Sequence, residues 1–315
     1  MSSPIESVDA VAHSLWLRPG IAVIPQGEQI QLRAGDEDIF VFEVDESEVV
    51  LHWLRRLAAG SATDELRGEV PDDLAATWNA VMEQLAGAQP WLDRRIDPAD
   101  DIGKYLSHVV SNGAAAKPPE GVMLLSGNSP SCQLLATVLR EQGIETLIGD
   151  EKGQRGRNGS DELEPTAEVC LWEQANLTWA MRINDRAIES QRPCLFVDLS
   201  HGRHATLGPF FVPGEGACLR CYRQRWRENT STLEEFDAAE SAMLASPLPA
   251  FGTLPAYRYQ MVGLASAELF AFLTRHRPLR TLNRILTVDF EGMQMAGEPC
   301  WQVPWCGACG RGVKS

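Results

Sequence analysis

The sequence predicts an α/β protein in which a small α+β unit precedes a larger domain with a parallel sheet. Two patterns carry this prediction. Residues 15–92 contain three β-rich runs and then three helical patterns, and residues 122–150 contain an apolar run, a turn, an amphipathic helix and a second strand. A chain of 315 residues has room for two domains of this kind.

The first unit is predicted over residues 1–92. Its β-rich runs are Ile21–Ile24, Ile30–Arg33 and Ile39–Val44. Apolar residues at helical spacing and flanking Pro and Gly residues predict helices over 46–60, 61–66 and 71–87. Three strands followed by three helices indicate an α+β unit of winged-helix type.

A polar connection is predicted over residues 93–119, and the second unit over residues 120–315. Val122–Leu125 is a continuous apolar run of the kind that is buried in a parallel sheet. A turn, an amphipathic helix and a strand at Glu145–Asp150 complete one βαβ unit of Rossmann type. Further strands are expected at Val169–Trp172, Cys194–Leu199 and Ile285–Phe290, and helices near 178–191 and 257–275. Residues 228–256 are expected to form a long crossover.

The charge balance disfavours two classes of partner. Lys and Arg total 28 against 43 for Asp and Glu, which gives a formal net charge of −15. Such a chain repels nucleic acid and anionic membrane surfaces. No apolar run approaches the roughly 20 residues of a spanning helix, and the first residues lack the features of a secretory signal. We therefore expect a cytoplasmic protein that binds neither nucleic acid nor membrane.

Two Cys-x-x-Cys pairs are the sharpest chemical signal. They are Cys218 with Cys221, and Cys306 with Cys309. Paired knuckles of this spacing can present four thiolates to a structural Zn²⁺ ion, which leaves no position for substrate. The alternatives are a redox Cys-x-x-Cys and unligated buried thiols. The other four cysteines lie in apolar or turn contexts and are expected in the core.

The turn of the first βα unit lacks most of a nucleotide-binding glycine loop. Gly127 is present, but the two later glycines of Gly-x-Gly-x-x-Gly are missing, and Pro130 removes a backbone donor. A structural turn without nucleotide is therefore favoured, and ATP is not expected to bind. His201 and His204 have no nucleophile motif nearby and are expected to be loop residues.

The second unit resembles the ThiF/MoeB/HesA superfamily of ubiquitin-activating-enzyme-like proteins. The βαβ start, the two Cys-x-x-Cys pairs and the helix around Val262–Leu269 carry this resemblance. More specifically, Gly208–Cys221 is similar to a stretch of the cyclodehydratase partner proteins, including ocin-ThiF-like proteins. These act in the biosynthesis of ribosomal peptides that bear thiazole and oxazole rings, such as thiopeptides. The resemblance implies a non-catalytic subunit, a separate YcaO enzyme that performs ATP-dependent cyclodehydration, and a homodimer formed through the α/β domain.

The first unit resembles a PqqD-like recognition element, which implies that it binds the leader of a precursor peptide. An extended peptide can add a strand to the edge of a three-stranded sheet. The residues expected to form this groove are Ile39, Phe40, Val41, Phe42, Glu43, Val44, Leu74, Trp78, Val81 and Leu85. The alternative is that these apolar residues form the core of the unit.

Two other functions are weighed against the leader-binding role. The first is a ThiF-like enzyme that uses ATP to adenylate a peptide or protein carboxylate. The second, more remote, is a nicotinamide-dependent oxidoreductase. Both require a glycine loop that this chain lacks.

Overall fold

The computed structural model describes residues 15–17, 21–34, 38–44, 46–86, 91–93, 102, 105, 119–127, 129–149, 164–247 and 252–310. The chain divides into two units, Met1–Pro118 and Pro119–Ser315. The sequence places the end of the first unit at residue 92 and the start of the second at residue 120, and these finer boundaries stay predictions.

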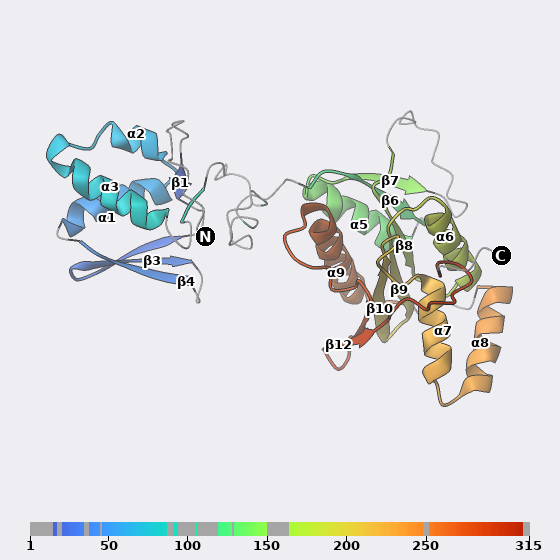
Figure 1. Cartoon of the computed structure of the whole chain (residues 1–315). Coiled ribbons are helices and arrows are strands. Elements are labelled where there is room, and N and C mark those ends of the chain that lie inside the picture. The colour runs from blue at the N-terminus through green and yellow to red at the C-terminus, as the bar shows by residue number, and fades with distance from the viewer. Residues whose placement is uncertain are drawn as a thin grey trace, which may run out of the picture. The chain divides into compact units, whose positions relative to one another are not determined.

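The first unit contains the predicted succession of strands and helices (Figure 1). Its elements are β1 (Trp16–Leu17), β2 (Ala22–Gln26), β3 (Gln29–Ala34), β4 (Asp38–Glu43), α1 (Ser47–Ala58), α2 (Thr63–Arg67), a 3-10 turn at Asp72–Leu74, α3 (Ala75–Leu85) and β5 (Leu92–Asp93). β2, β3 and β4 form an antiparallel sheet in that order, so β4 is an edge strand. The short β1 and β5 pair separately.

The helices of this unit pack on one face of its sheet. Ile30 and Leu32 of β3 are buried, as period-two alternation requires. They share one core cluster with Leu54 and Leu57 of α1. α1 also contacts α3 through Trp53 and Trp78, whose rings lie edge to face with their centroids 5.3 Å apart.

The second unit is built on a seven-stranded mixed sheet. Its strands are β6 (Val122–Ser126), β7 (Glu145–Gly149), β8 (Ala167–Trp172), β9 (Cys194–His201), β10 (His204–Phe211), β11 (Arg284–Asp289) and β12 (Gln294–Pro299). They lie in the order β12-β11-β10-β9-β8-β6-β7. β7, β6, β8 and β9 are parallel, whereas β10, β11 and β12 join by antiparallel pairing. The parallel part is the predicted α/β alternation.

Helices cover both faces of this sheet (Figure 1). They are α5 (Pro130–Glu141), α6 (Leu177–Glu189), α7 (Leu219–Asn229), α8 (Leu233–Ala245) and α9 (Pro255–Thr274). α5 and α9 pack together on one face, and α6, α7 and α8 contact one another on the other. None of the helices in the described part of the chain is long and apolar enough to cross a membrane.

Three elements are not among those that the sequence predicts. The predicted crossover at 228–256 contains α8. This helix has no buried residue, and its sequence lacks the apolar stripe that would predict a helix. β10 includes Gly208 and Pro209, which argue against a strand in sequence terms, yet it pairs with strands on both sides. β12 is exposed along its whole length and lacks the alternation of a half-buried strand.

Candidate functional site

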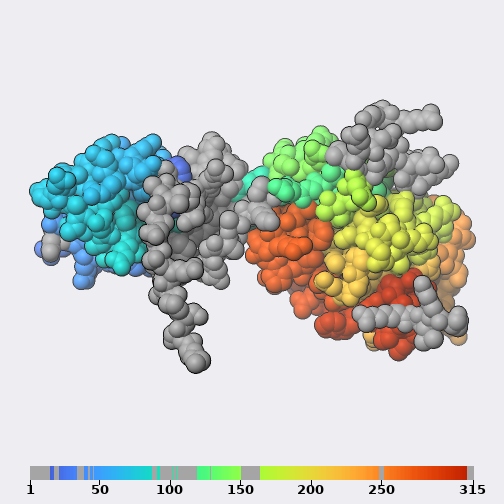
Figure 2. Space-filling model, turned by 45° about the horizontal axis from the view of Figure 1, so that its top comes forward, coloured from blue at the N-terminus to red at the C-terminus, as the bar shows by residue number. Residues whose placement is uncertain are grey.

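The four cysteines of the two Cys-x-x-Cys pairs meet in one cluster. Cys218 immediately precedes α7, and Cys221 lies in the first turn of that helix. Cys306 and Cys309 come from the segment after β12. In Figure 2 the red C-terminal segment lies at the surface of this unit, next to yellow residues from the middle of the sequence. The sulfur atoms of the four cysteines all lie within 4.8 Å of one another.

The distances between these sulfur atoms fit a tetrahedral metal site. Cys218 Sγ lies 3.8 Å from the Sγ of both Cys221 and Cys306, and Cys221 Sγ lies 3.4 Å from Cys309 Sγ. Four thiolates about 2.3 Å from a central Zn²⁺ would lie about 3.8 Å apart, whereas a disulfide would bring two of them to about 2.05 Å. All four cysteines are free of disulfides. The cluster can hold one metal ion.

Backbone and side-chain donors surround the thiols, as they do around metal-bound thiolates. The Val303 N–H donates to Cys221 Sγ at 3.3 Å. Gln302 Nε2 donates to the carbonyl oxygen of Cys309 at 2.8 Å and approaches its sulfur at 3.6 Å. Hydrogen bonds from Cys218 lower the pKa of Cys306, and they lower that of Cys309 to about 7. Hydrogen bonding within the cluster thus lowers the pKa of Cys306 and Cys309 and raises that of Cys218 and Cys221.

α6 holds the start of α7, and with it the first cysteine pair. Asn184 of α6 is fully buried, and its Oδ1 accepts the Leu219 N–H at 2.8 Å. Next to it, Asp185 accepts two hydrogen bonds from Arg220 at 3.1 and 2.7 Å. The buried amide satisfies a helix N-terminus that has no side-chain cap of its own.

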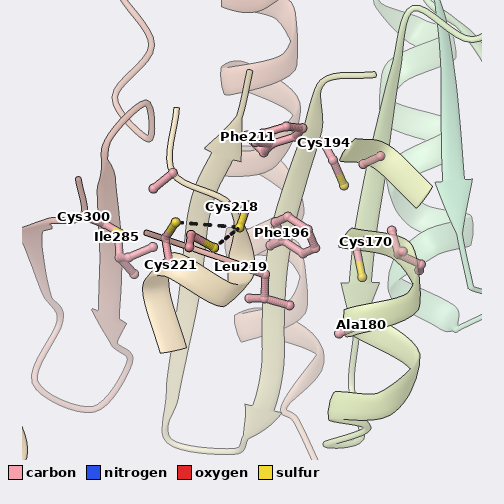
Figure 3. Packing of buried hydrophobic residues seen from close by; sticks show 14 of the residues in the cluster. Cys170, Ala180, Cys194, Phe196, Phe211, Cys218, Leu219, Cys221, Ile285 and Cys300 are labelled. Carbon is pink, nitrogen blue, oxygen red and sulfur yellow. Dashed lines mark hydrogen bonds between the residues drawn. The ribbon is translucent and has the colours of Figure 1, made fainter. Parts of the chain in front are cut away.

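The other four cysteines are buried core residues, as expected. They are Cys132, Cys170, Cys194 and Cys300. Cys170 and Cys194 lie on neighbouring strands apart from the four-thiol cluster (Figure 3). Burial raises the pKa of both thiols well above the usual range, so they stay protonated.

The predicted leader groove falls on β4, which is an edge strand of the described sheet, on Val44 directly after it, and on α3 and the 3-10 turn before that helix. Ile39 and Val41 are 48% and 42% exposed on the outer face of the sheet, and Glu43 is also exposed. Phe40 and Val44 are half-buried against the core of the unit. The side chain of Phe42 lies outside the described residues.

The residues of this predicted groove on α3 and in the 3-10 turn before it lie deeper. Trp78, Val81 and Leu85 are fully buried in the core cluster, and Leu74 packs against its margin. These side chains therefore support the fold of the unit, and the accessible part of the predicted groove is the edge strand. A leader-binding role for any of the ten residues stays a prediction.

The two histidines predicted in a loop lie where β9 turns into β10. His201 ends β9 and His204 begins β10. His201 Nε2 lies 3.2 Å from an Asp198 carboxylate oxygen. This hydrogen bond raises the pKa of His201, while burial and the charge of Arg223 oppose the rise. The Ser200 hydroxyl also donates to Asp198, at 2.6 Å.

Sequence reasoning missed two groups of polar residues that the fold brings together. The first group joins Glu173 and Arg258 at the start of α5. The second joins the fully buried Glu168 of β8 to Ser126 and Arg186. A charged residue inside the apolar strand Ala167–Trp172 is the one signal that marks Glu168. Nothing in the sequence marks Glu173, because its partners are distant along the chain.

Comparisons with known proteins give similarity of structure alone. No model of a known protein family matches the sequence, and no curated protein matches it. A heterocyclase in complex with substrate and cofactor superposes with a TM-score of 0.71 at 22% identity, over 95% of this chain and 40% of that chain. The heterocyclase TruD gives 0.71 at 21% identity, over 94% of this chain and 43% of that chain.

A second group of solved structures matches along its whole length. E. coli MccB with succinimide gives a TM-score of 0.59 at 12% identity, over 95% of this chain and 99% of that chain. The present chain thus spans 40–43% of the length of the two heterocyclases and almost all of MccB. At these identities the likeness concerns the fold, and the chain has the fold that these heterocyclase and MccB structures share.

Proposed function

We propose that this chain is the leader-peptide-binding partner of a YcaO cyclodehydratase. It would act in the cytoplasm, in the biosynthesis of azoline- or azole-containing ribosomal peptides such as thiopeptides or bacteriocins. The first unit would be a PqqD-like winged helix that recruits the precursor. The second would be a ThiF/MoeB-like, Rossmann-type domain that forms a homodimer and lacks a reaction of its own.

The observation that carries this proposal is the coverage of the heterocyclase match. Both units of this chain are included in it, since 95% of the chain is covered. The match leaves 60% of the heterocyclase without a counterpart here, because 40% of that chain is covered. The proposed source of the cyclisation chemistry is a YcaO enzyme that acts on Cys, Ser and Thr residues.

The edge strand β4 supports the peptide-binding role. Its outer edge has no strand partner in the described sheet. An added strand gains main-chain hydrogen bonds there, and side chains on the added strand contact those of the edge strand. Val41 and Ile24 both flank Gln31 on the outer face, but Val41 is on β4 and Ile24 is on β2. This pair offers a matched test of which edge is used.

The test is fluorescence anisotropy of a labelled leader peptide, taken from a precursor gene beside this one, with the full-length protein. Val41→Asp should weaken binding by about fivefold or more, which corresponds to a lost cross-strand pair of about 1 kcal/mol. Ile24→Asp should leave the affinity unchanged. No binding to any neighbouring precursor would overturn the leader-binding role, and equal effects of both variants would overturn the choice of β4.

Zinc is the proposed occupant of the four-thiol cluster, with a structural role. The cysteine pairs lie 88 residues apart. A cross-link over such a loop removes on the order of 4–5 kcal/mol of chain entropy from the unfolded state. Cys309→Ser should lose the metal and melt at a lower temperature, whereas Cys300→Ser, outside the cluster, should keep it. Metal analysis should give about one zinc per wild-type chain; a fully folded, metal-free protein with freely titratable thiols would contradict this.

Adenylation of a peptide or protein carboxylate is the second candidate. MccB structures, including one with ATP at a TM-score of 0.56 and 13% identity, share the fold along almost their whole length. Pyrophosphate exchange with ATP, Mg²⁺ and the precursor peptide separates the two functions. Exchange above background would favour the adenylating enzyme, and its absence together with leader binding would favour the partner protein.

A further inference from the structure

The turn between β6 and α5 lies where nucleotide-binding α/β domains hold a phosphate. β6 and β8 are neighbouring parallel strands, and α5 begins directly beyond the carboxyl end of β6. In domains that bind nucleotides, the N–H groups at the start of such a helix donate to the phosphate. Whether this helix can do the same depends on which of those groups are free.

The first turn of α5 has no free N–H group in residues 130–133. Pro130 has no N–H. Cys132 donates its N–H to the side chain of Ser129 at 3.2 Å, and Gln133 donates to the carbonyl oxygen of the same residue at 3.2 Å. The remaining N–H, that of Ser131, points to a carboxylate supplied by the protein itself.

That carboxylate belongs to Glu173, which follows the last residue of β8. Its Oε1 accepts the Ser131 N–H at 2.9 Å and also the Ser131 hydroxyl. Arg258, from the first turn of α9, donates to both carboxylate oxygens at 3.1 and 3.2 Å. The Arg258 Nε also lies 3.1 Å from the Ser131 hydroxyl oxygen. The two charged side chains are only 20% and 22% exposed.

We infer that Glu173 is an internal anion that occupies the phosphate position of this fold and closes the second unit to ATP. A helix N–H, a hydroxyl and a bidentate guanidinium are the same donors that would bind a phosphate. Because the carboxylate is tethered at this position, an external phosphate must displace it before it meets any of these donors. This inference is independent of leader binding by the first unit.

The test compares full-length wild type, Glu173→Ala and Glu141→Ala. Glu141 is an exposed carboxylate at the opposite end of α5 and serves as the matched control. The probes are inorganic phosphate and then ATP with Mg²⁺. Isothermal titration calorimetry measures the affinity for each probe, and NMR measures the change in the ¹⁵N chemical shift of the Ser131 amide. Glu173→Ala should bind phosphate at least about tenfold more tightly than wild type and shift the Ser131 signal, since a helix N-terminus and an arginine become free. Glu141→Ala should behave as wild type.

Two further variants keep the test decisive. In Glu173→Ala/Arg258→Ala the gained phosphate binding should disappear, because the guanidinium is lost. Glu173→Gln keeps the shape of the side chain and should gain weaker phosphate binding, which covers the case in which the alanine variant does not fold. Wild type that binds ATP as tightly as Glu173→Ala would overturn the inference. So would folded alanine and glutamine variants that bind no phosphate.

Discussion

Replacing Gly310 with alanine tests whether the last cysteine pair depends on a close approach of backbone atoms that only glycine allows. A Cβ atom at Gly310 would lie 2.6 Å from the Cys306 carbonyl oxygen and 2.7 Å from both the Cys306 nitrogen and the Pro304 carbonyl oxygen. All three neighbours are backbone atoms, so no side chain can move aside. At Gly307, in the same turn, a Cβ would meet nothing within 4 Å.

The size of the effect follows from these distances. Ordinary contact begins near 3.4 Å, so the backbone around Cys306 must shift by roughly 0.7–0.8 Å to accept the methyl group. Metal–ligand distances tolerate changes of only about 0.2 Å. We expect Gly310→Ala to lose about 10–100-fold in zinc affinity, the range found when residues behind the ligands are changed, or about 1.4–2.7 kcal/mol.

Competition with a chromophoric zinc chelator measures this loss, and thermal melting with and without chelator checks that it acts through the metal. Gly307→Ala should keep the affinity and the melting temperature of wild type. If the two variants released zinc equally readily, the contact argument for Gly310 would be wrong. If neither variant nor wild type contained metal, the assignment of the cluster as a zinc site would fail first.

Two further predictions concern the polar groups around the sheet. Because Asp198 raises the pKa of His201 above 6.5, the stabilisation from this pair should be complete below about pH 6.5 and lost as the pH rises through the raised pKa; NMR titration should show the shift, and Asp198→Asn should abolish it. Asn184→Ala should lower the free energy of unfolding in urea by about 1–2 kcal/mol, because the Leu219 N–H loses its buried acceptor. Arg182→Ala, exposed on the same helix, should stay within about 0.5 kcal/mol of wild type.

The sequence predicts best those elements whose pattern and environment agree. The alternation of Ile30 and Leu32 with polar residues predicts a half-buried strand, and the structure confirms it. The Cys-x-x-Cys spacing predicts that four thiols can converge, because each pair needs only one local turn, and the structure brings them together. In both cases each part of the pattern lies within a few residues of the chain, although the two cysteine pairs themselves are 88 residues apart.

The features that escape prediction depend on contacts between distant segments. α8 has no apolar stripe to reveal it, and its Asp237 and Glu240 pair instead with arginines of α7. The buried positions of Trp78, Val81 and Leu85 are another case, since helical spacing marks an apolar face but does not tell a core from a groove. The Glu173–Arg258 contact joins residues 85 positions apart that have no motif.

The separation of the two cysteine pairs also sets an order of events during translation. Cys218 and Cys221 are made 88 residues before Cys306 and Cys309. At about 5–20 residues per second, the second pair follows the first after about 4–18 s. Through this interval the nascent chain holds only two of the four thiols of the cluster, and α9, β11 and β12 are synthesised meanwhile. Complete coordination of the proposed zinc ion would therefore be a late step in the maturation of the second unit, after the strands that the four-thiol cluster borders have been synthesised.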